Sequence, residues 1–233
     1  MGSSKGSIAP GSGAWEFEAR WTQFSGLSRG GNLWVGHSPK LRREVRFVRD
    51  VEYWHWLLVE AQPEIATFCE EPVPTHRYDA KLPALADVWL RRTDGSIEFR
   101  SIARSERQIS STARLLEETF GDGFIHRALS KEDVLSEPFL LDNSLRIVSF
   151  LSSSGPETSM DLLSSIEEAF RISQIQTLGE VVDRLGPRYG HQRILVALFG
   201  LIHQGTLRVN LYERIIETIQ LRWEGPGSAN IAP

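Results

Sequence analysis

Five residues that interrupt helices and strands, Ser152-Ser153-Ser154-Gly155-Pro156, stand in a row in the second half of the chain. The sequence before them mixes strand-like and helix-like apolar spacing, whereas the sequence after them is mainly helical. A chain broken in this way folds most simply as two units. We therefore expect a domain over residues 15–151, a linker over 152–158 and a second domain over 159–223.

The composition is that of a folded protein. The 233 residues are 41% hydrophobic and 24% charged, which is typical of globular chains. No apolar run approaches the roughly 18 residues of a membrane span, and the first residues lack the apolar segment of a secretory signal. We therefore expect a cytoplasmic protein without a membrane partner. Residues 1–14 and 224–233 are expected to be a disordered leader and tail. Cys69 is the only cysteine, which excludes internal disulfides and thiolate zinc clusters.

The first domain has the pattern of a mixed α/β fold. Val45 and Phe47 alternate with arginines, which predicts a strand. Apolar residues recur at helical spacing from Val51 to Leu58, and this predicts a helix that begins at Asp50 and stops before Pro63. Further expected elements are strands over 84–92 and 96–102 around the turn Thr93-Asp94-Gly95, a helix over 110–120, a strand over 125–129 and a helix over 136–151.

The second domain is predicted to contain three helices followed by two short strands, the order of a winged helix domain. The helices cover 160–172, 178–185 and 191–203, with a turn at Gly186-Pro187, and the strands cover 206–211 and 217–223. In the third helix the expected core residues are Ile194, Leu195, Leu198, Leu201 and Ile202. Gln192, Arg193, Val196, Phe199 and Gln204 are expected outside. A single outward arginine favours protein docking over DNA reading.

Three polar residues of the expected hairpin could take part in chemistry. Glu98 and Arg100 are two residues apart and share one face of the second strand. If the turn is centred between Asp94 and Gly95, Asp87 falls on that face too, although a register shift of one residue would separate them. Carboxylate oxygens bind Mg²⁺, and a nearby cation can stabilise a reacting phosphate. A solvated polar strand face would have the same spacing.

The order of these segments resembles the TnsA family, the endonuclease subunit of heteromeric transposases. VRFVRDVEYWHWLLVEAQPEIATFCEEP (45–72) is similar to that family's strand and glutamate-bearing helix, and ALADVWLRRTDGSIEFRSI (84–102) to its active-site hairpin. Residues 126–147 are similar to the segment that follows, and 177–223 to the C-terminal domain. The resemblance implies a restriction-endonuclease-like mixed sheet with flanking helices, followed by an α+β winged helix domain.

The resemblance also implies a site and partners. Glu52, Asp87 and Glu98 would bind Mg²⁺ or Mn²⁺, with Arg100 beside the phosphate. The activity implied is cleavage of the non-transferred strand at transposon ends. Partners would be double-stranded DNA, a DDE transposase subunit and an AAA+ ATPase regulator.

Two positions depart from the family pattern. Ala86 replaces a proline, and Arg100 replaces a lysine. A guanidinium group stays protonated and cannot act as a base. The alternative function is therefore a catalytically inactive TnsA-like subunit that acts in DNA binding and transposase assembly. A free-standing winged helix regulator is disfavoured by the apolar third helix.

A basic run precedes the first helix. Between Ser38 and Asp50 five basic residues face two acids, which suits contact with a phosphate backbone, although a solvated strand edge is an equal interpretation. The basic residues are Lys40, Arg42, Arg43, Arg46 and Arg49. Trp15, Trp21 and Trp34 could stack on DNA or a partner, but docking within the chain is the preferred interpretation.

Overall fold

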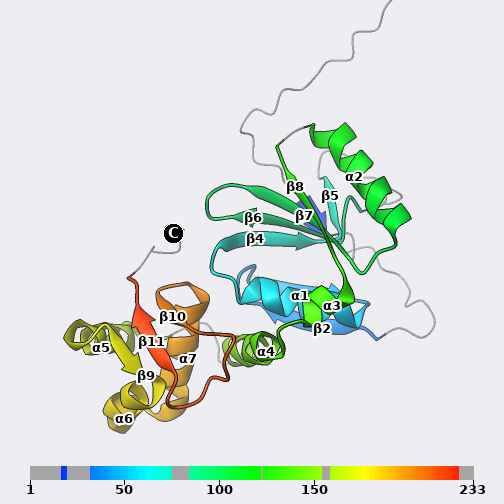
Figure 1. Ribbon diagram of the computed structural model, residues 1–233. Coiled ribbons are helices and arrows are strands. Elements are labelled where there is room, and N and C mark those ends of the chain that lie inside the picture. Colours follow the sequence, from blue (N-terminus) through cyan, green and yellow to red (C-terminus); the bar gives the residue numbers. More distant parts are fainter. Residues whose placement is uncertain (1–16, 20–31, 75–83, 122, 154–157, 226–233) are drawn as a thin grey trace, which may run out of the picture.

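A four-stranded mixed sheet is the centre of the N-terminal part of the chain (Figure 1). The computed structural model describes residues 17–19, 32–74, 84–121, 123–153 and 158–225. The sheet order is β4-β6-β7-β8, antiparallel except between β7 and β8. These strands are β4 (Ile65–Glu70), β6 (Val88–Arg92), β7 (Ile97–Ile102) and β8 (Ile125–Leu129). The expected α/β class and mixed sheet are confirmed.

Helices cover both faces of this sheet. Helix α2 (Glu106–Phe120) connects the parallel strands β7 and β8, which need such a crossover. It packs over Trp89 and Phe99 through its buried Leu116. On the other face lie α1 (Asp50–Glu60), α3 (Lys131–Leu135) and α4 (Pro138–Ser153).

Two small strand pairs complete the N-terminal part. Strands β2 (Trp34–Ser38) and β3 (Arg43–Phe47) form an antiparallel hairpin, and β1 (Phe17–Ala19) pairs with β5 (Pro72–Pro74). Trp34 stacks on Tyr53 with ring centroids 4.4 Å apart, and its Nε1 donates a hydrogen bond to Asp50 Oδ1 at 2.7 Å. Docking within the chain is thus confirmed for Trp34, whereas Trp15 and Trp21 lie outside the described residues.

The C-terminal part packs three helices against a three-stranded antiparallel sheet of order β10-β11-β9. Its elements are α5 (Met160–Ile172), β9 (Ile175–Thr177), α6 (Leu178–Tyr189), α7 (His191–His203), β10 (Leu207–Val209) and β11 (Gln220–Trp223). Helix α4 links the two parts, because Val148 is buried in the core beside α1 while its neighbour Ile147 is buried in the C-terminal core.

Several local expectations were wrong. Pro187 lies inside α6 rather than in a turn. Only the last helical turn follows it, because Gly190 ends the helix with φ 81°. Phe199 is completely buried instead of facing outward, since Phe150 of α4 covers it at a centroid distance of 5.2 Å. Strand β9 was not expected.

The expected linker and ends are tested only in part. Helix α4 continues to Ser153 and so includes the first two residues of the expected linker, while 154–157 lie outside the described residues. The expected leader, 1–14, also lies outside them. At the other end, the Glu224 amide donates to the Thr206 carbonyl at 3.0 Å, so ordered chain extends beyond Trp223. Among the helices described, none has the length and apolar character that crossing a membrane requires.

Candidate functional site

Asp87 lies immediately before β6 and is buried. Its Oδ2 accepts a hydrogen bond from the Ile102 amide at 2.7 Å, and its Oδ1 accepts one from Arg49 Nη2 at 3.2 Å. Arg104 donates two hydrogen bonds to the same carboxylate, one from Nε to Oδ1 at 3.0 Å and one from Nη2 to Oδ1. The hydrogen bond to Asp87 raises the pKa of Arg104 above its ordinary value. Both carboxylate oxygens are therefore already occupied by protein donors.

Glu52 lies in the first turn of α1, where its negative charge interacts favourably with the helix dipole. Glu52 is not part of the apolar spacing from Val51 to Leu58, yet it is only 7% exposed. The reason is Arg49, whose guanidinium donates to Glu52 Oε1 from Nε at 2.8 Å and from Nη2 at 2.6 Å. Because Arg49 Nη2 also contacts Asp87, one guanidinium group joins Glu52 to Asp87.

Glu98 is fully buried in β7 among three arginines. Arg100 Nε donates at 2.7 Å, Arg92 Nη2 donates at 3.1 Å, and Arg127 Nε lies 3.4 Å away. Burial by itself would raise the pKa of Glu98, but the hydrogen bonds and charges of these arginines outweigh it and lower the pKa. We call Glu98, Arg92, Arg100 and Arg127 the Glu98 arginine cluster. With one carboxylate and three guanidinium groups, it carries an excess of positive charge.

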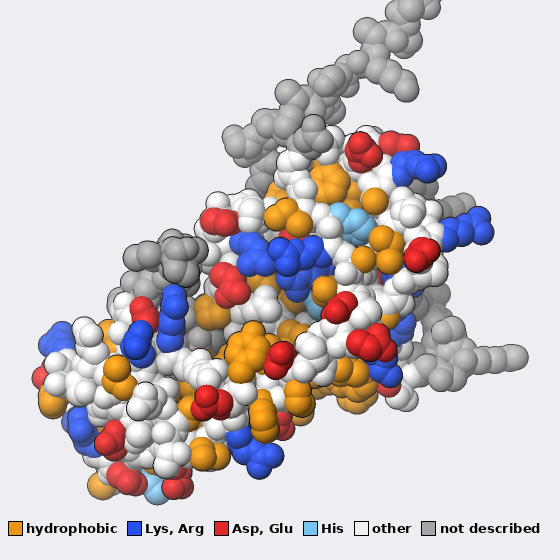
Figure 2. All heavy atoms as spheres, in the orientation of Figure 1, with side chains coloured by type: hydrophobic (Ala, Val, Ile, Leu, Met, Phe, Trp, Pro, Cys, Tyr) orange, Lys and Arg blue, Asp and Glu red, His pale blue; other side chains and the backbone are white. Residues whose placement is uncertain are grey.

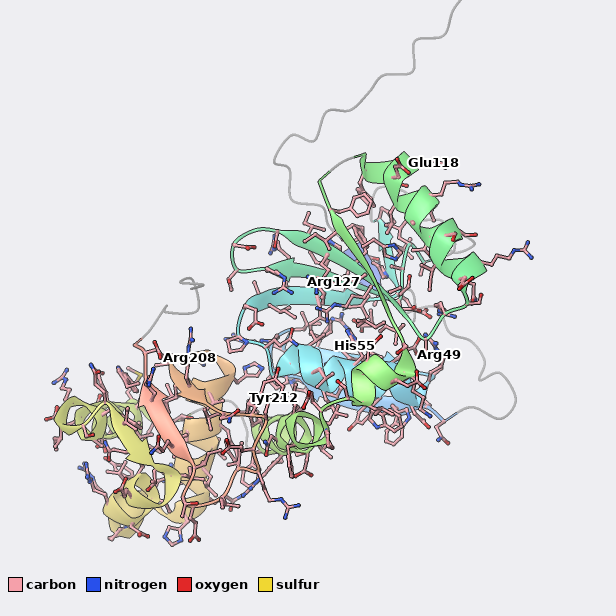
Figure 3. The ribbon with its side chains drawn as sticks, viewed as in Figure 1. Arg49, His55, Glu118, Arg127, Arg208 and Tyr212 are labelled. Atoms are coloured by element: carbon pink, nitrogen blue, oxygen red, sulfur yellow. The ribbon has the colours of Figure 1, made fainter. Side chains whose placement is uncertain are left out.

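His55 of α1 closes this cluster from below in the view of Figure 3. Its Nε2 lies 2.9 Å from Arg100 Nη1, and a guanidinium can only donate, so His55 Nε2 accepts and Nδ1 carries the proton. Burial, with the charge of Arg100 added, holds the pKa of His55 well below its ordinary value. Among the described residues Nδ1 has no hydrogen-bond partner. The neutral imidazole thus orients Arg100.

The pairing of β6 with β7 differs by one residue from the expected register. Val88 pairs with Arg100 and Leu90 with Glu98. Asp87 precedes this ladder, and its amide donates to the Arg100 carbonyl at 3.0 Å. The loop has three residues centred on Asp94, with Arg92 N bonded to Ser96 O at 2.9 Å, and not a two-residue turn.

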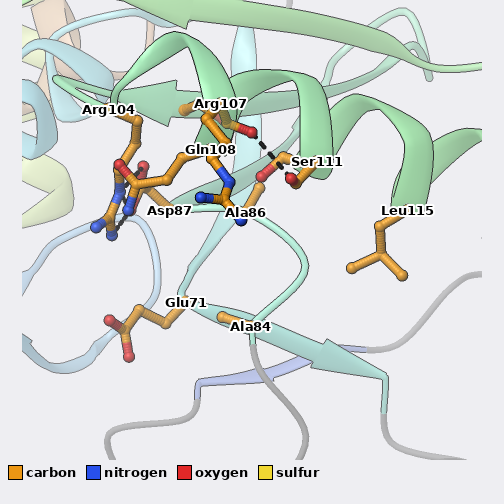
Figure 4. A pocket seen from close by; sticks show the side chains of 11 residues that line it. Glu71, Ala84, Ala86, Asp87, Arg104, Arg107, Gln108, Ser111 and Leu115 are labelled. Carbon is orange, nitrogen blue, oxygen red and sulfur yellow. Dashed lines mark hydrogen bonds and ion pairs between the residues drawn. The ribbon is translucent and has the colours of Figure 1, made fainter.

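A polar cavity of about 420 Å³ opens beside Asp87 on the α2 face (Figure 4). Arg104 and Ser101 line it from the sheet side, and Gln108 and Ser111 line it from α2. The Oγ of Ser101 lies 3.0 Å from His126 Nε2. Glu98, the second carboxylate expected beside Asp87, does not line this cavity, whereas Glu71 does.

The donor set does not fit Mg²⁺. A hard cation needs several free oxygen ligands around one point, but guanidinium groups hold Glu52, Asp87 and Glu98. Within the part of the chain that the structure describes, no cluster of three or more His, Cys, Asp or Glu side chains could hold a metal ion. Around the three carboxylates stand five arginines, Arg49, Arg92, Arg100, Arg104 and Arg127.

The basic run before α1 is largely used inside the protein. Lys40 Nζ donates to the Gln62 carbonyl at 3.1 Å, and burial lowers the pKa of Lys40. Arg43 makes two hydrogen bonds to Glu70, and Arg46 pairs with Glu44. Arg42 is exposed at the β2–β3 turn. The run therefore does not form one basic surface.

Sequence reasoning missed Arg92, Arg104, Arg127 and His55. A signal existed for Arg92, because it shares the strand face of Glu98 once the hairpin register is known. The chain matches no protein-family model and no curated protein sequence.

Proposed function

We propose that this chain is a non-cleaving, TnsA-like subunit that binds double-stranded DNA and acts in transposase assembly. The observation that carries the proposal is the neutralisation of every candidate metal ligand by arginine, with Glu98 buried among three guanidinium groups. A site built in this way attracts phosphate and repels divalent cations. The order of elements supports a restriction-endonuclease-like sheet followed by a winged helix domain.

DNA contact would use the exposed members of the Glu98 arginine cluster. The side chain of Arg127 is 55% exposed and that of Arg92 is 23% exposed, so both can reach a ligand. Figure 2 shows a group of Lys and Arg side chains gathered over the central sheet, and Figure 3 labels Arg127 there. Asp94 lies in the β6–β7 turn, where hydrogen bonding to Ser96, with a smaller contribution from the charge of Arg92, lowers its pKa. A DDE transposase subunit and an AAA+ regulator are the partners that the family resemblance suggests.

The first test is cleavage. Supercoiled plasmid incubated with the protein and Mg²⁺ or Mn²⁺ should stay supercoiled, both with the protein alone and after addition of any DDE transposase and AAA+ ATPase found in the neighbouring genes. Nicking that depends on the divalent ion and disappears in Glu98→Gln would overturn the non-cleaving assignment and restore the endonuclease.

The second test is binding. Fluorescence anisotropy with a short duplex should show affinity that falls as salt rises. Arg127→Gln should reduce the slope of log affinity against log salt by about one, and Arg127→Lys should retain it. The matched control is Arg188→Gln, because Arg188 is exposed and paired with Asp161. Equal affinity in Arg127→Gln and wild type would place the DNA elsewhere.

A further inference from the structure

Two arginines face each other on the outer side of the C-terminal sheet. Arg208 of β10 and Arg222 of β11 are direct register partners, and both are exposed. Their neighbours Leu207 and Leu221 are buried on the inner side, so the register fixes both arginines outward. Like charges directly opposite each other destabilise an antiparallel pair.

Little in the described structure offsets this repulsion. Glu224 Oε1 lies 3.8 Å from Arg208 Nε, an ion pair too long for a hydrogen bond. No carboxylate oxygen of the described residues lies within 4.0 Å of the Arg222 guanidinium. The third residue of this cross-strand row is Ile175 of β9, which is 45% exposed. The row thus presents two poorly compensated cations beside an exposed apolar side chain.

This arginine pair lies on the same side of the molecule as the Glu98 arginine cluster. In Figure 2 one group of Lys and Arg side chains covers the central sheet and a second covers the C-terminal sheet. Figure 3 labels Arg127 in the first region and Arg208 in the second. A long, rigid polyanion could therefore contact both regions at once.

We propose that Arg208 and Arg222 together bind a backbone phosphate of the same duplex DNA that contacts the Glu98 arginine cluster. The inference rests on the proposed DNA-binding function and adds a second contact, made by the sheet of the C-terminal part and not by α7. A phosphate between the two guanidinium groups accepts hydrogen bonds from both and replaces their repulsion by attraction. A backbone contact of this kind positions the duplex without reading its sequence.

The experiment compares two double variants that change the net charge equally. Arg208→Gln with Arg222→Gln removes the pair, while Arg171→Gln with Arg188→Gln removes two exposed arginines that are paired with Glu167, Glu168 and Asp161. Duplex affinity is measured by anisotropy from about 50 to about 200 mM NaCl. Thermal unfolding is measured on the same samples without DNA.

We expect the first variant to lose about one unit of salt slope, because one phosphate contact is removed, so that the difference in affinity from wild type shrinks about three- to fourfold across this salt range. Its melting temperature should equal or exceed that of wild type, because a like-charge pair has been removed. The control should bind as wild type does. A drop in melting temperature would show that the pair has a structural role and would overturn the proposal.

Three further outcomes are decisive. Wild-type affinity and slope in Arg208→Gln with Arg222→Gln, alongside weakened binding in Arg127→Gln, would overturn only this inference. If the pair variant binds DNA normally but loses capture of the purified ATPase regulator or transposase, the pair is a protein contact and the inference is wrong. Absence of duplex binding by wild type would overturn the proposed function together with this second contact.

Discussion

Glu60 of α1 and His203 of α7 meet between the two parts of the chain, with His203 Nε2 3.0 Å from Glu60 Oε2. Glu60 is fully buried and also accepts hydrogen bonds from Ser38 Oγ, from Trp56 Nε1 at 3.1 Å and from the Lys40 amide at 3.3 Å. A carboxylate with this many donors is satisfied without solvent. The contact therefore ties α7 to α1 and to the β2–β3 hairpin.

This contact should weaken in acid. Burial lowers the pKa of His203, the charge of Lys40 adds to that effect, and the hydrogen bond to Glu60 opposes it only in part. A histidine whose pKa is lower in the folded state contributes full stability above its unfolded pKa of about 6.5 and loses it as the pH falls below that value. Melting temperatures between about pH 7.5 and pH 5 should therefore fall in wild type and fall less in His203→Gln.

His55 also has a lowered pKa, so its protonation on unfolding also reduces stability as the pH falls. For this reason the test is the difference in melting temperature between wild type and His203→Gln at each pH. A fall in the wild-type melting temperature alone does not identify His203 as its cause. Identical pH dependence in the two proteins would show that His203 does not titrate with unfolding.

Local periodicity was enough to predict many elements. The bounds of α5, α7 and β8 agree with the expected ranges, because spacings of 3.6 and 2 are visible within one segment. The hairpin was also predicted, but its register was not. A three-residue loop and a two-residue turn around the same Asp94-Gly95 pair differ by one residue, and that difference changes every cross-strand partner, so that Val88 and not Trp89 lies opposite Arg100.

The candidate site depended on contacts between distant segments, which spacing does not report. Arg49 binds Asp87, 38 residues away, and His55 binds Arg100, 45 residues away. Such pairings converted expected metal ligands into ion pairs. The burial of Phe199 has the same origin, because the residue that covers it belongs to α4.

The Glu98 arginine cluster should be essential for stability. Removing one member of a buried ion pair typically costs about 3–5 kcal/mol, because the remaining charge is left without a partner. Glu98→Leu should therefore strongly lower the free energy of unfolding in urea. Adding Arg100→Leu should recover part of the loss, since the buried guanidinium is then gone as well. A double variant whose loss equals the sum of the single losses would show that Glu98 and Arg100 are not coupled.

Gly36 should not tolerate a side chain. A Cβ at this position of β2 would lie 2.6 Å from Cη2 of Trp56, a buried ring that also stacks on Phe47. Overpacking of this kind typically costs about 1–3 kcal/mol, so Gly36→Ala should lower the urea midpoint. The control is Val35→Ala, because Val35 is 51% exposed on the same strand. Equal stability of Gly36→Ala and wild type would mean that Trp56 can move aside at little cost.

We expect Arg49 and Arg104 to prevent divalent cations from binding to the carboxylates of Glu52 and Asp87. The wild-type melting temperature should not change with Mg²⁺, because guanidinium groups already neutralise both carboxylates. Arg49→Ala with Arg104→Ala leaves the two carboxylates close together and unneutralised, which destabilises the protein and gives a cation something to bind. Mg²⁺ should then raise the melting temperature of this double variant, and adding Asp87→Asn should abolish the rise. Calorimetric Mg²⁺ titration provides the direct measurement. A double variant that folds and gains nothing from Mg²⁺, or a wild type that gains as much, would show that the arginines do not exclude the metal.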